Sequence, residues 1–540
     1  MKKFAYLMAA FLVAMTGCQK ESPAEQAGGE IAAGEKIYME LKIQAVDTRS
    51  GSDGTIEDGN FTGGTGDTNS NAAPDYEVGK NYENTISSVD VVLRNADKFI
   101  VASNVVPTAK DGGWLATFNS GAIAAGEKYL VYIYANCSAS QNLDATSKAS
   151  IEEITGISGT GDGKTGKFWM TNAYTATEVT VDELSTDSTK PTMLGTHFVE
   201  RSMARFDYMA VKDGNVYTLT DEKNNGIKVT LTHAAIINQS REFYLLRHAT
   251  KSGNTLGTNN SNVVIGYPEI ASNYVVDTDW TAKSTAFNSN PKDYSTIVGN
   301  FDYHLSTPED WSWKSLSSFT EEDNDNLPGT AGGATGITPS HSTYGDYKIF
   351  GYVKENTLPD VNSQVNGMST GVVFKGQITD NGIDGVITTA AGKDIYMFDG
   401  KLYGVWANVV EAAKTSEVLK YYVDKFDETI ESSEYAALAS AGFTRYSAEK
   451  DGNYYAYYYY WNRHNDNEDN KAMGAMEFAV VRNNVYKLCV DYITKLGHPT
   501  PGAPDPDPVD PEDPNESGEY YFGVSVKVVP WVVRVNHIGW

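Results

Sequence analysis

The chain ends in a spacer rich in proline and aspartate, followed by a long apolar segment. The spacer, residues 499–518, reads PTPGAPDPDPVDPEDPNESG, and the terminal segment, residues 519–540, reads EYYFGVSVKVVPWVVRVNHIGW. Because proline lacks an N–H and favours extended polyproline II, the spacer predicts a linker that holds the terminal segment away from the preceding fold. An apolar strand left free would aggregate. We therefore expect this segment to be buried on another element, and the linker lets that element belong to another molecule.

The terminal segment has the alternation of a β-strand. Its apolar residues are spaced two apart, which places them on one face of a strand, and the pattern resumes after Pro530. We expect this segment to be a donor strand that serves assembly rather than catalysis. Its predicted buried residues are Phe522, Val524, Val526, Val528, Trp531 and Val533.

The first residues have the pattern of a bacterial export signal. Two lysines precede the apolar residues 4–15, a run too short to span a membrane as a stable helix. The run ends in Met-Thr-Gly-Cys, which resembles a lipoprotein cleavage box and predicts lipidation of Cys18. An ordinary secretory signal is the alternative. Residues 19–34 are polar and suit a flexible tether, so we expect a chain anchored to a membrane and not threaded through it.

A second alternating segment follows the tether. Residues 37–45 read IYMELKIQA and predict a half-buried strand. Arg49 comes next, and residues 50–71 are rich in Gly, Asp, Asn, Ser and Thr, which predicts a mobile loop open to proteolytic nicking. We hypothesise that the terminal strand replaces this first strand. The predicted buried residues of the first strand are Ile37, Met39, Leu41 and Ile43.

Composition narrows the class of protein. The 540 residues include 34 Tyr and 49 Gly, which favours strands and turns over helices. The formal net charge of -27 argues against a nucleic-acid partner, because phosphates would be repelled. Apart from Cys18, the cysteines are Cys137 and Cys489. Both lie in apolar alternating runs and are predicted to be buried thiols, with a disulfide left open.

The alternation and turn signals predict a mostly β protein of two β-sandwich domains with a few short helices. A helical region is predicted at residues 409–426, and residues 197–206 are predicted to begin the second set of strands. Predicted strands lie at 88–94, 99–102, 114–118, 129–136, 168–170, 177–181, 227–238, 242–246, 348–354, 371–379, 394–398, 454–461 and 480–492. The predicted organisation is a signal peptide at 1–18, a tether and removable first strand at 19–49, domains at 50–200 and 201–498, the linker at 499–518 and the donor strand at 519–540.

Four segments of the sequence resemble one family. They are VERSMAR at 199–205, VVRNNVY at 480–486, ITKLG at 493–497 and, beyond the spacer, VKVVPW at 526–531. These segments, in this order behind a lipobox cysteine, resemble the Bacteroidia type V fimbrillins, with the closest likeness to the shaft subunit of the minor (short) fimbriae. The likeness is most specific over the last 60 or so residues.

This resemblance implies a structural role at the cell surface. Such proteins have two transthyretin-like β-sandwich domains and are exported as outer-membrane lipoproteins. The resemblance implies that an Arg-specific surface protease cuts between Arg49 and Ser50 and removes the first strand. The C-terminal strand of a neighbouring copy then fills the groove, and the polymer supports adhesion and biofilm formation. The implied partners are other copies of the chain, anchor and tip subunits, the protease, and host or bacterial surface receptors.

Motifs for chemistry are weak. Gly367-Met-Ser369-Thr-Gly371 spells a hydrolase motif, but a strand and not a helix is predicted after it. The 8 histidines are scattered without metal-ligand spacing. We therefore predict no catalytic, cofactor-binding or metal-binding residues. The aromatic run at 454–461 suits a strand covered on both faces, and a surface that stacks on sugars or proteins is the alternative.

Three functions follow from these patterns. The first is a fimbrial subunit that polymerises by strand exchange. The second is a monomeric surface lipoprotein that binds glycan or a host protein, with its terminal strand folded back on its own chain. The third, an exported hydrolase, has only Ser369 in its favour.

Overall fold

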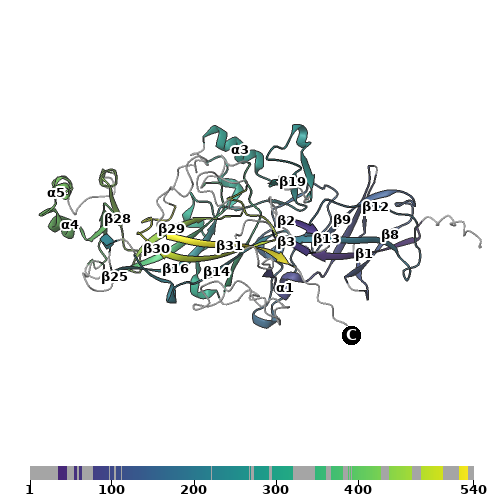
Figure 1. The fold of residues 1–540 in the computed structure, drawn as a ribbon, viewed down its shortest axis with the longest axis horizontal. Coiled ribbons are helices and arrows are strands. Elements are labelled where there is room, and N and C mark those ends of the chain that lie inside the picture. Colours follow the sequence, from purple (N-terminus) through teal and green to yellow (C-terminus); the bar gives the residue numbers. More distant parts are fainter. Residues whose placement is uncertain are drawn as a thin grey trace, which may run out of the picture.

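The computed structural model is mostly β and elongated, with one sheet unit at each side of a central junction (Figure 1). It describes residues 34–45, 54–57, 60–63, 77–96, 98–102, 105–110, 112–219, 222–224, 226–266, 268, 273–290, 295–319, 347–359, 367–380, 387, 390, 392–426, 437–464, 476–502 and 522–532. For residues 54–57, 60–63, 77–78 and 522–532 it describes the backbone alone. The predicted signal peptide and almost the whole spacer lie outside these ranges.

The N-terminal unit is a nine-stranded sheet that curves around its own core. Strands far apart in the sheet order, β6 and β8, come into contact, so the sheet has the form of a sandwich. Its inward residues alternate along each strand, as they do at Trp114, Ala116 and Phe118. The strand order is β6 (Phe99–Ala102), β5 (Val89–Arg94), β9 (Lys128–Ala135), β11 (Met170–Asn172), β13 (Thr192–Arg201), β1 (Lys36–Ala45), β8 (Gly113–Asn119) and β7 (Val106–Pro107), with β12 (Glu178–Thr180) also paired to β9.

The C-terminal unit has two five-stranded sheets that enclose the largest apolar core. Within it Phe206 stacks on Tyr486, with ring centroids 5.1 Å apart. One sheet has the order β24 (Lys348–Val353), β14 (Ala204–Met209), β30 (Asn484–Ile493), β31 (Phe522–Val532) and β4 (Glu77–Val78). The other consists of β15 (Val216–Thr218), β16 (Ile227–Ile237), β25 (Gly371–Asp380) and β29 (Tyr454–Trp461), with β23 (Lys314–Ser315) on β16.

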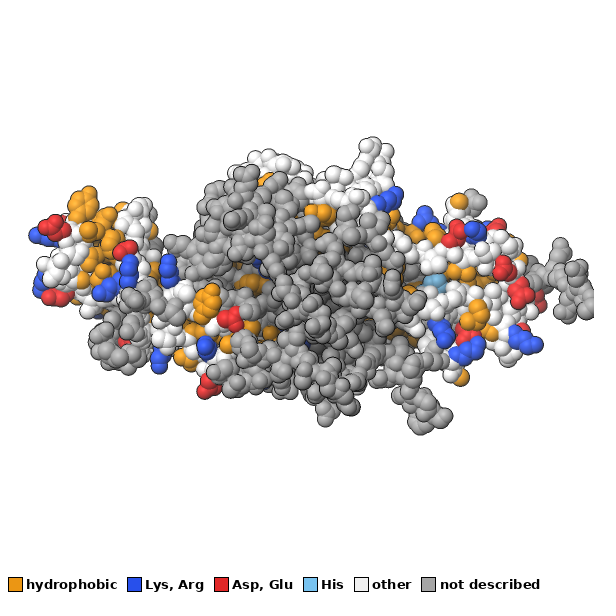
Figure 2. Space-filling view, viewed as in Figure 1, with side chains coloured by type: hydrophobic (Ala, Val, Ile, Leu, Met, Phe, Trp, Pro, Cys, Tyr) orange, Lys and Arg blue, Asp and Glu red, His pale blue; other side chains and the backbone are white. Residues whose placement is uncertain are grey.

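A small lobe extends from the outer end of the C-terminal unit. It consists of β26 (Ile395–Phe398), β27 (Lys401–Gly404), β28 (Phe443–Tyr446), α4 (Trp406–Ala413) and α5 (Glu417–Val423). The predicted helical region is therefore two helices. The first ends at Ala413, and Ser416 caps the second by accepting a hydrogen bond from the Leu419 N–H at 3.3 Å. Apolar side chains gather on the surface of this lobe (Figure 2), where Val418 and Tyr421 are exposed.

One continuous segment joins the two units. Strand β13 belongs to the N-terminal sheet and β14, which begins three residues after β13 ends, belongs to the C-terminal sheet. Residues 197–201 were predicted to begin the second set of strands. They instead complete the first sheet, because Met170–Asn172 pairs with Val199–Arg201.

No helix among the described residues has the length and apolar character needed to cross a membrane. The remaining elements are short. They are β2 (Gly54–Glu57), β3 (Asn60–Gly63), β10 (Thr146–Ser147), β17 (Gln239–Ser240), β18 (Phe243–Tyr244), β19 (His248–Thr250), β20 (Val263–Ile265), β21 (Val275–Val276), β22 (Phe301–Asp302), α1 (Asn81–Asn84), α2 (Ile151–Thr155) and α3 (Trp280–Ser289), with 3-10 turns at Gly161–Gly163, Asp213–Asn215, Glu222–Asn224, Thr258–Asn260, Val298–Asn300, Pro308–Asp310 and Leu316–Ser318.

Candidate assembly site

The first strand, β1, is an interior strand of the N-terminal sheet. It runs parallel to β13 and antiparallel to β8, so both of its edges are paired. Its four predicted inward residues are buried, with exposed fractions of 0% for Ile37, Met39 and Leu41 and 2% for Ile43. The alternation in the sequence therefore corresponds to one face inside the core.

Strand β1 also holds the sheet together. In the described part of the sheet, β8 and β7 are hydrogen-bonded to the other strands only through β1. If β1 were withdrawn, β13 and β8 would each present a row of unpaired backbone N–H and C=O groups, with an apolar cleft between them. Unpaired edges of this kind are templates for another strand.

The terminal strand, β31, is paired within its own chain. It runs antiparallel along β30, from Phe522 opposite Ile493 to Pro530 opposite Asn484. Its last residues pair with the two-residue strand β4. Figure 1 shows β31 ending near the junction. The expectation that the spacer holds this segment away from the preceding fold therefore differs from the single-chain structure. The physical reason is that β30 has an edge whose backbone groups β31 can pair with.

Several predicted site residues lie outside the described part. Cys18, Arg49, Ser50 and Val533 are among them. For Phe522, Val524, Val526, Val528 and Trp531 the structure gives the backbone register alone. Their roles in lipidation, cleavage and donation stay predictions.

The segment that meets the end of β31 is fixed by buried ion pairs. Glu83, on α1, accepts a hydrogen bond from Arg205 at 2.9 Å and another from the Tyr352 hydroxyl at 2.6 Å. Arg205 also makes a two-bond contact with Asp207, at 2.9 and 2.8 Å. Arg205, Glu83 and Asp207 are fully buried. Removing one partner of such a pair is strongly destabilising, because the other charge would be left unpaired in the core.

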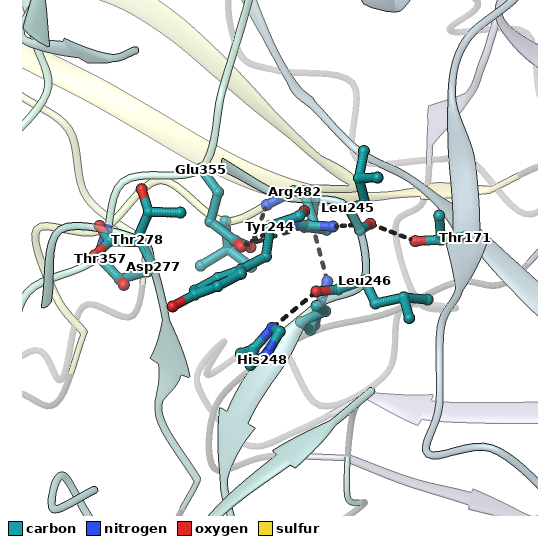
Figure 3. A network of polar contacts seen from close by, with 12 residues as sticks. Thr171, Tyr244, Leu245, Leu246, His248, Asp277, Thr278, Glu355, Thr357 and Arg482 are labelled. Atoms are coloured by element: carbon teal, nitrogen blue, oxygen red, sulfur yellow. Dashed lines mark hydrogen bonds and ion pairs between the residues drawn. The ribbon is translucent and has the colours of Figure 1, made fainter. Parts of the chain in front are cut away.

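A second buried cation ties the two units together (Figure 3). The Arg482 guanidinium pairs with Glu355 at 3.1 Å and donates to the carbonyl oxygens of Tyr244, at 2.8 Å, and Leu245, at 3.2 Å. Thr171, in the N-terminal sheet, donates to the same Leu245 oxygen at 2.8 Å. The start of β30 is therefore held at the junction, independently of β1.

These acidic partners were not predicted from the sequence. Glu83, Asp207 and Glu355 are all buried. The arginines themselves gave an indication of buried ion pairs, because the segment VERSMAR carries two of them among the apolar residues of a strand. The partner of each arginine could not be read from the sequence, since Glu83 lies more than a hundred residues before Arg205.

Motifs that were discounted lie in structural settings. Ser369 is buried and is followed by strand β25, not by a helix. Cys137 and Cys489 are not joined in a disulfide, and burial raises the pKa of the Cys137 thiol to about 12. On β29, Tyr454 and Tyr458 face the main core while Tyr457 contacts Trp313 on the other face, which favours the structural interpretation of the aromatic run. Within the described residues no cluster of three metal-ligating side chains occurs.

The C-terminal part of the chain matches a known family. Residues 452–537 match the sequence model described as "Major fimbrial subunit protein type IV, Fimbrillin, C-terminal". The matched residues include β29, β30 and β31, so the match covers the terminal strand and the strand with which it pairs.

Several solved structures align with most of the chain, at low sequence identity and with TM-scores below 0.5. A putative cell adhesion protein from Parabacteroides distasonis ATCC 8503 is 11% identical with a TM-score of 0.36, covering 94% of this chain and 99% of that one. A fimbrilin from Porphyromonas gingivalis W83 is 11% identical with a TM-score of 0.34, covering 92% and 98%. The C-terminally truncated tip fimbrial protein of Porphyromonas gingivalis is 8% identical with a TM-score of 0.30, covering 92% and 100%. No curated protein sequence matches the chain.

Proposed function

We propose that this chain is a non-enzymatic structural subunit of cell-surface fimbriae that polymerises by strand exchange. In this proposal β1 is removed from each copy, and the terminal strand of another copy takes its place between β13 and β8. The observation that carries the proposal is the interior position of β1, whose loss would open two strand edges at once. The fimbrillin C-terminal match supports the same class of function.

The burial of β1 keeps it in the sheet of the uncleaved precursor. Burying the four inward side chains of β1 contributes roughly 6–12 kcal/mol gross, at about 1.5–3 kcal/mol each. The strand therefore does not leave spontaneously while it is covalently attached. After cleavage it becomes a separate segment that another strand of similar length can displace, and β31 has 11 residues against 10 for β1.

Strand direction gives the arrangement of neighbouring copies. Lys36 lies opposite Asn119 at the outer end of the N-terminal sheet, whereas Ala45 lies opposite Val199 near the junction. A strand that replaces β1 in the same direction starts at the outer end, so its linker comes from a copy placed beyond that end. The contact joins two different surfaces and does not close on itself, which makes a filament.

Maturation and partners extend the proposal. The precursor would be an outer-membrane lipoprotein attached through Cys18, and an Arg-specific surface protease would cut after Arg49. The mature chain would lie in the fimbrial shaft, with anchor and tip subunits at the ends and host or bacterial receptors as targets of adhesion. A shaft role is favoured because the chain has both a removable strand and a donor strand.

The test is cleavage of the purified precursor with an Arg-specific protease, followed by non-boiled denaturing gels and negative-stain microscopy. We expect ladders and filaments from the intact chain. A chain that lacks residues 519–540 should be cleaved and stay monomeric. If the truncated chain still forms ladders, the terminal strand is not the donor.

The matched control is Arg49→Ala. Exposed arginines elsewhere, such as Arg241, stay available to the protease in this variant. We expect no ladder, because the first strand stays attached. Ladders from Arg49→Ala with an intact N-terminus would contradict cleavage at this position.

The monomeric surface binder is favoured by one observation, the pairing of β31 with β30 in the same chain. Ser525 lies opposite Cys489 in that pairing, so Ser525→Cys can report it by forming an intrachain disulfide. For an exchanging subunit, oxidation should block ladders and reduction should restore them. If cleaved, reduced protein stays monomeric with β31 in place, the monomeric binder is the better description.

A further inference from the structure

The outer face of β1 carries a buried acidic side chain, although this face should be open to solvent. Glu40 has an exposed fraction of 2%. Lys110 Nζ lies 2.7 Å from its Oε2 atom, and the Thr108 hydroxyl donates to its Oε1 atom at 3.2 Å. Lys110 itself is largely exposed, so its charge is solvated with or without Glu40.

The hairpin between β7 and β8 is shaped to cover this position. The Thr108 N–H donates to the Gly113 oxygen and the Gly113 N–H donates to the Lys110 oxygen, both at 2.9 Å. A Cβ at Gly113 would clash with the Thr108 hydroxyl and lie 3.0 Å from Glu40 Oε1. The absence of a side chain at Gly113 is therefore what lets the two donors close over the position of Glu40.

We propose that this polar pocket, made by Thr108, Lys110 and Gly113, sets the register of the strand that enters the cleft. In the polymer Ser525 occupies the position that Glu40 has in the precursor. This inference rests on the proposed strand exchange. A serine hydroxyl is short enough for the pocket and can accept hydrogen bonds from both donors.

This register aligns the inward faces as well. The four inward positions of β1 are taken in order by Phe522, Val524, Val526 and Val528. The ring of Phe522 recovers part of the volume that the three valines lose, and all four inward positions stay apolar, which is the property that a core requires first. Lys527 then takes the exposed position of Lys42, so its charge stays in water.

A shift of two residues in one direction is opposed by two features. It would place Lys527 at the position of Glu40, directly beside Lys110. It would also place Pro530 at the position of Ile43, whose N–H donates to the Gly112 oxygen at 3.0 Å. Proline has no N–H to replace that bond.

A shift of two residues in the other direction is opposed by two different features. It would place Gly523 in the polar pocket, where it offers no side-chain acceptor to Thr108 and Lys110. It would also place Tyr520 at the position of Ile37, which is fully buried in the apolar core. A phenol hydroxyl there would lose its hydrogen bonds to water.

Cysteine cross-linking between copies tests the register. Glu40 lies opposite the exposed Met193, so Met193→Cys is combined with Gly523→Cys, Ser525→Cys or Lys527→Cys, with Cys137 and Cys489 replaced by alanine. After cleavage, assembly and oxidation, we expect a disulfide-linked ladder from the Ser525 pair alone. A ladder from the Gly523 or Lys527 pair overturns the register.

The outcomes separate this inference from the proposed function. Non-covalent ladders without any of the three disulfides overturn the register and leave strand exchange standing. The absence of every ladder, in variants that are cleaved and folded, overturns exchange itself. For direction, a Lys527→Cys and Thr196→Cys pair should also cross-link, because Lys42 lies opposite Thr196.

A charge test does not depend on disulfide geometry. Ser525→Lys should lower the ladder yield several-fold, because it places two lysines in one pocket, whereas Ser525→Glu should keep the yield by restoring the precursor's pair with Lys110. Lys527→Glu is the matched control and should leave assembly unchanged. Equal yields from the two Ser525 variants would overturn the pocket's role.

Discussion

The first and last described strands of this chain have the same alternation and nearly the same length, yet they are held differently. Strand β1 has a long partner on each edge, and its inward side chains are fully buried. Strand β31 has one long partner, β30, and meets β4 over only two residues. β1 is therefore part of the framework of its sheet, whereas β31 is an addition to an edge.

This difference indicates which of the two strands can leave its partners while the chain is still uncut. Leaving an edge breaks one ladder of hydrogen bonds, whereas leaving an interior position breaks two and opens the core. A strand of the second kind is best removed after the chain is cut. The single-chain structure is thus compatible with a stored terminal strand and a first strand that requires proteolysis.

The largest expected effect comes from placing a charge in each strand. Leu41→Asp puts a carboxylate into a fully buried position, so we expect the free energy of unfolding to fall by more than about 4 kcal/mol. Val526→Asp in β31 should change the stability of the precursor far less. Urea denaturation of the uncleaved chains measures both.

The same pair of variants gives the opposite result in assembly. Val526→Asp should abolish ladders after cleavage, although its precursor folds. The comparison between the strands fails if Val526→Asp unfolds the precursor as severely as Leu41→Asp does.

The next effect concerns the junction that both strands approach. Arg205→Ala leaves Glu83 and Asp207 without their buried cation, so we expect a loss of about 3–5 kcal/mol in the free energy of unfolding. Arg241→Ala is the matched control, because its pair with Asp302 is about half exposed and should contribute no more than about 1 kcal/mol. Equal losses in the two variants would show that the junction pairs do not hold the units.

The smallest expected effect is a pH dependence of folding stability that comes from His197, on the strand β13 beside β1. His197, opposite Ile43, has a pKa lowered by burial, against the opposing effect of its contact with the Leu194 carbonyl. Its neutral form is favoured in the folded chain. The stability that this provides is present above the ordinary histidine pKa of about 6.5 and is lost as the pH falls through the lowered pKa of the folded chain. The loss is about 1.4 kcal/mol for each unit by which the folded pKa lies below the unfolded one.

His197→Gln isolates this contribution from those of other histidines. We expect the wild-type chain to lose more stability than the variant between pH 7.5 and pH 5, in urea denaturation at matched ionic strength. Parallel profiles would mean that His197 does not titrate across this range in a fold-dependent way.

Much of the strand pattern could be predicted from local sequence. Residues 99–102, 371–379 and 454–461 were predicted as strands and have these bounds within one residue, because alternation reports which side chains face a core. Prediction was weaker where a segment is polar and short. Residues 242–246 form only the two-residue strand β18, and their role at the junction comes from backbone oxygens that carry no sequence signal.

The candidate site could be predicted in part. Alternation identified the four inward residues of β1 and the presence of a terminal strand, whereas the spacer did not predict that this strand pairs with β30. The same alternation places Glu40 on the outer face but does not predict its burial, because nothing local distinguishes a carboxylate in water from one covered by a hairpin seventy residues later. The buried pairs of Arg205 and Arg482 were missed for the same reason.

The sequence by itself determined that this is a β protein with an alternating strand near each end, because these properties depend on neighbouring residues. Only the tertiary structure decided that β1 is an interior strand, that β31 returns to β30 and that a polar pocket covers Glu40. Which edges are paired and which charges are covered depends on contacts between residues far apart in the chain, and these form only when the whole core assembles.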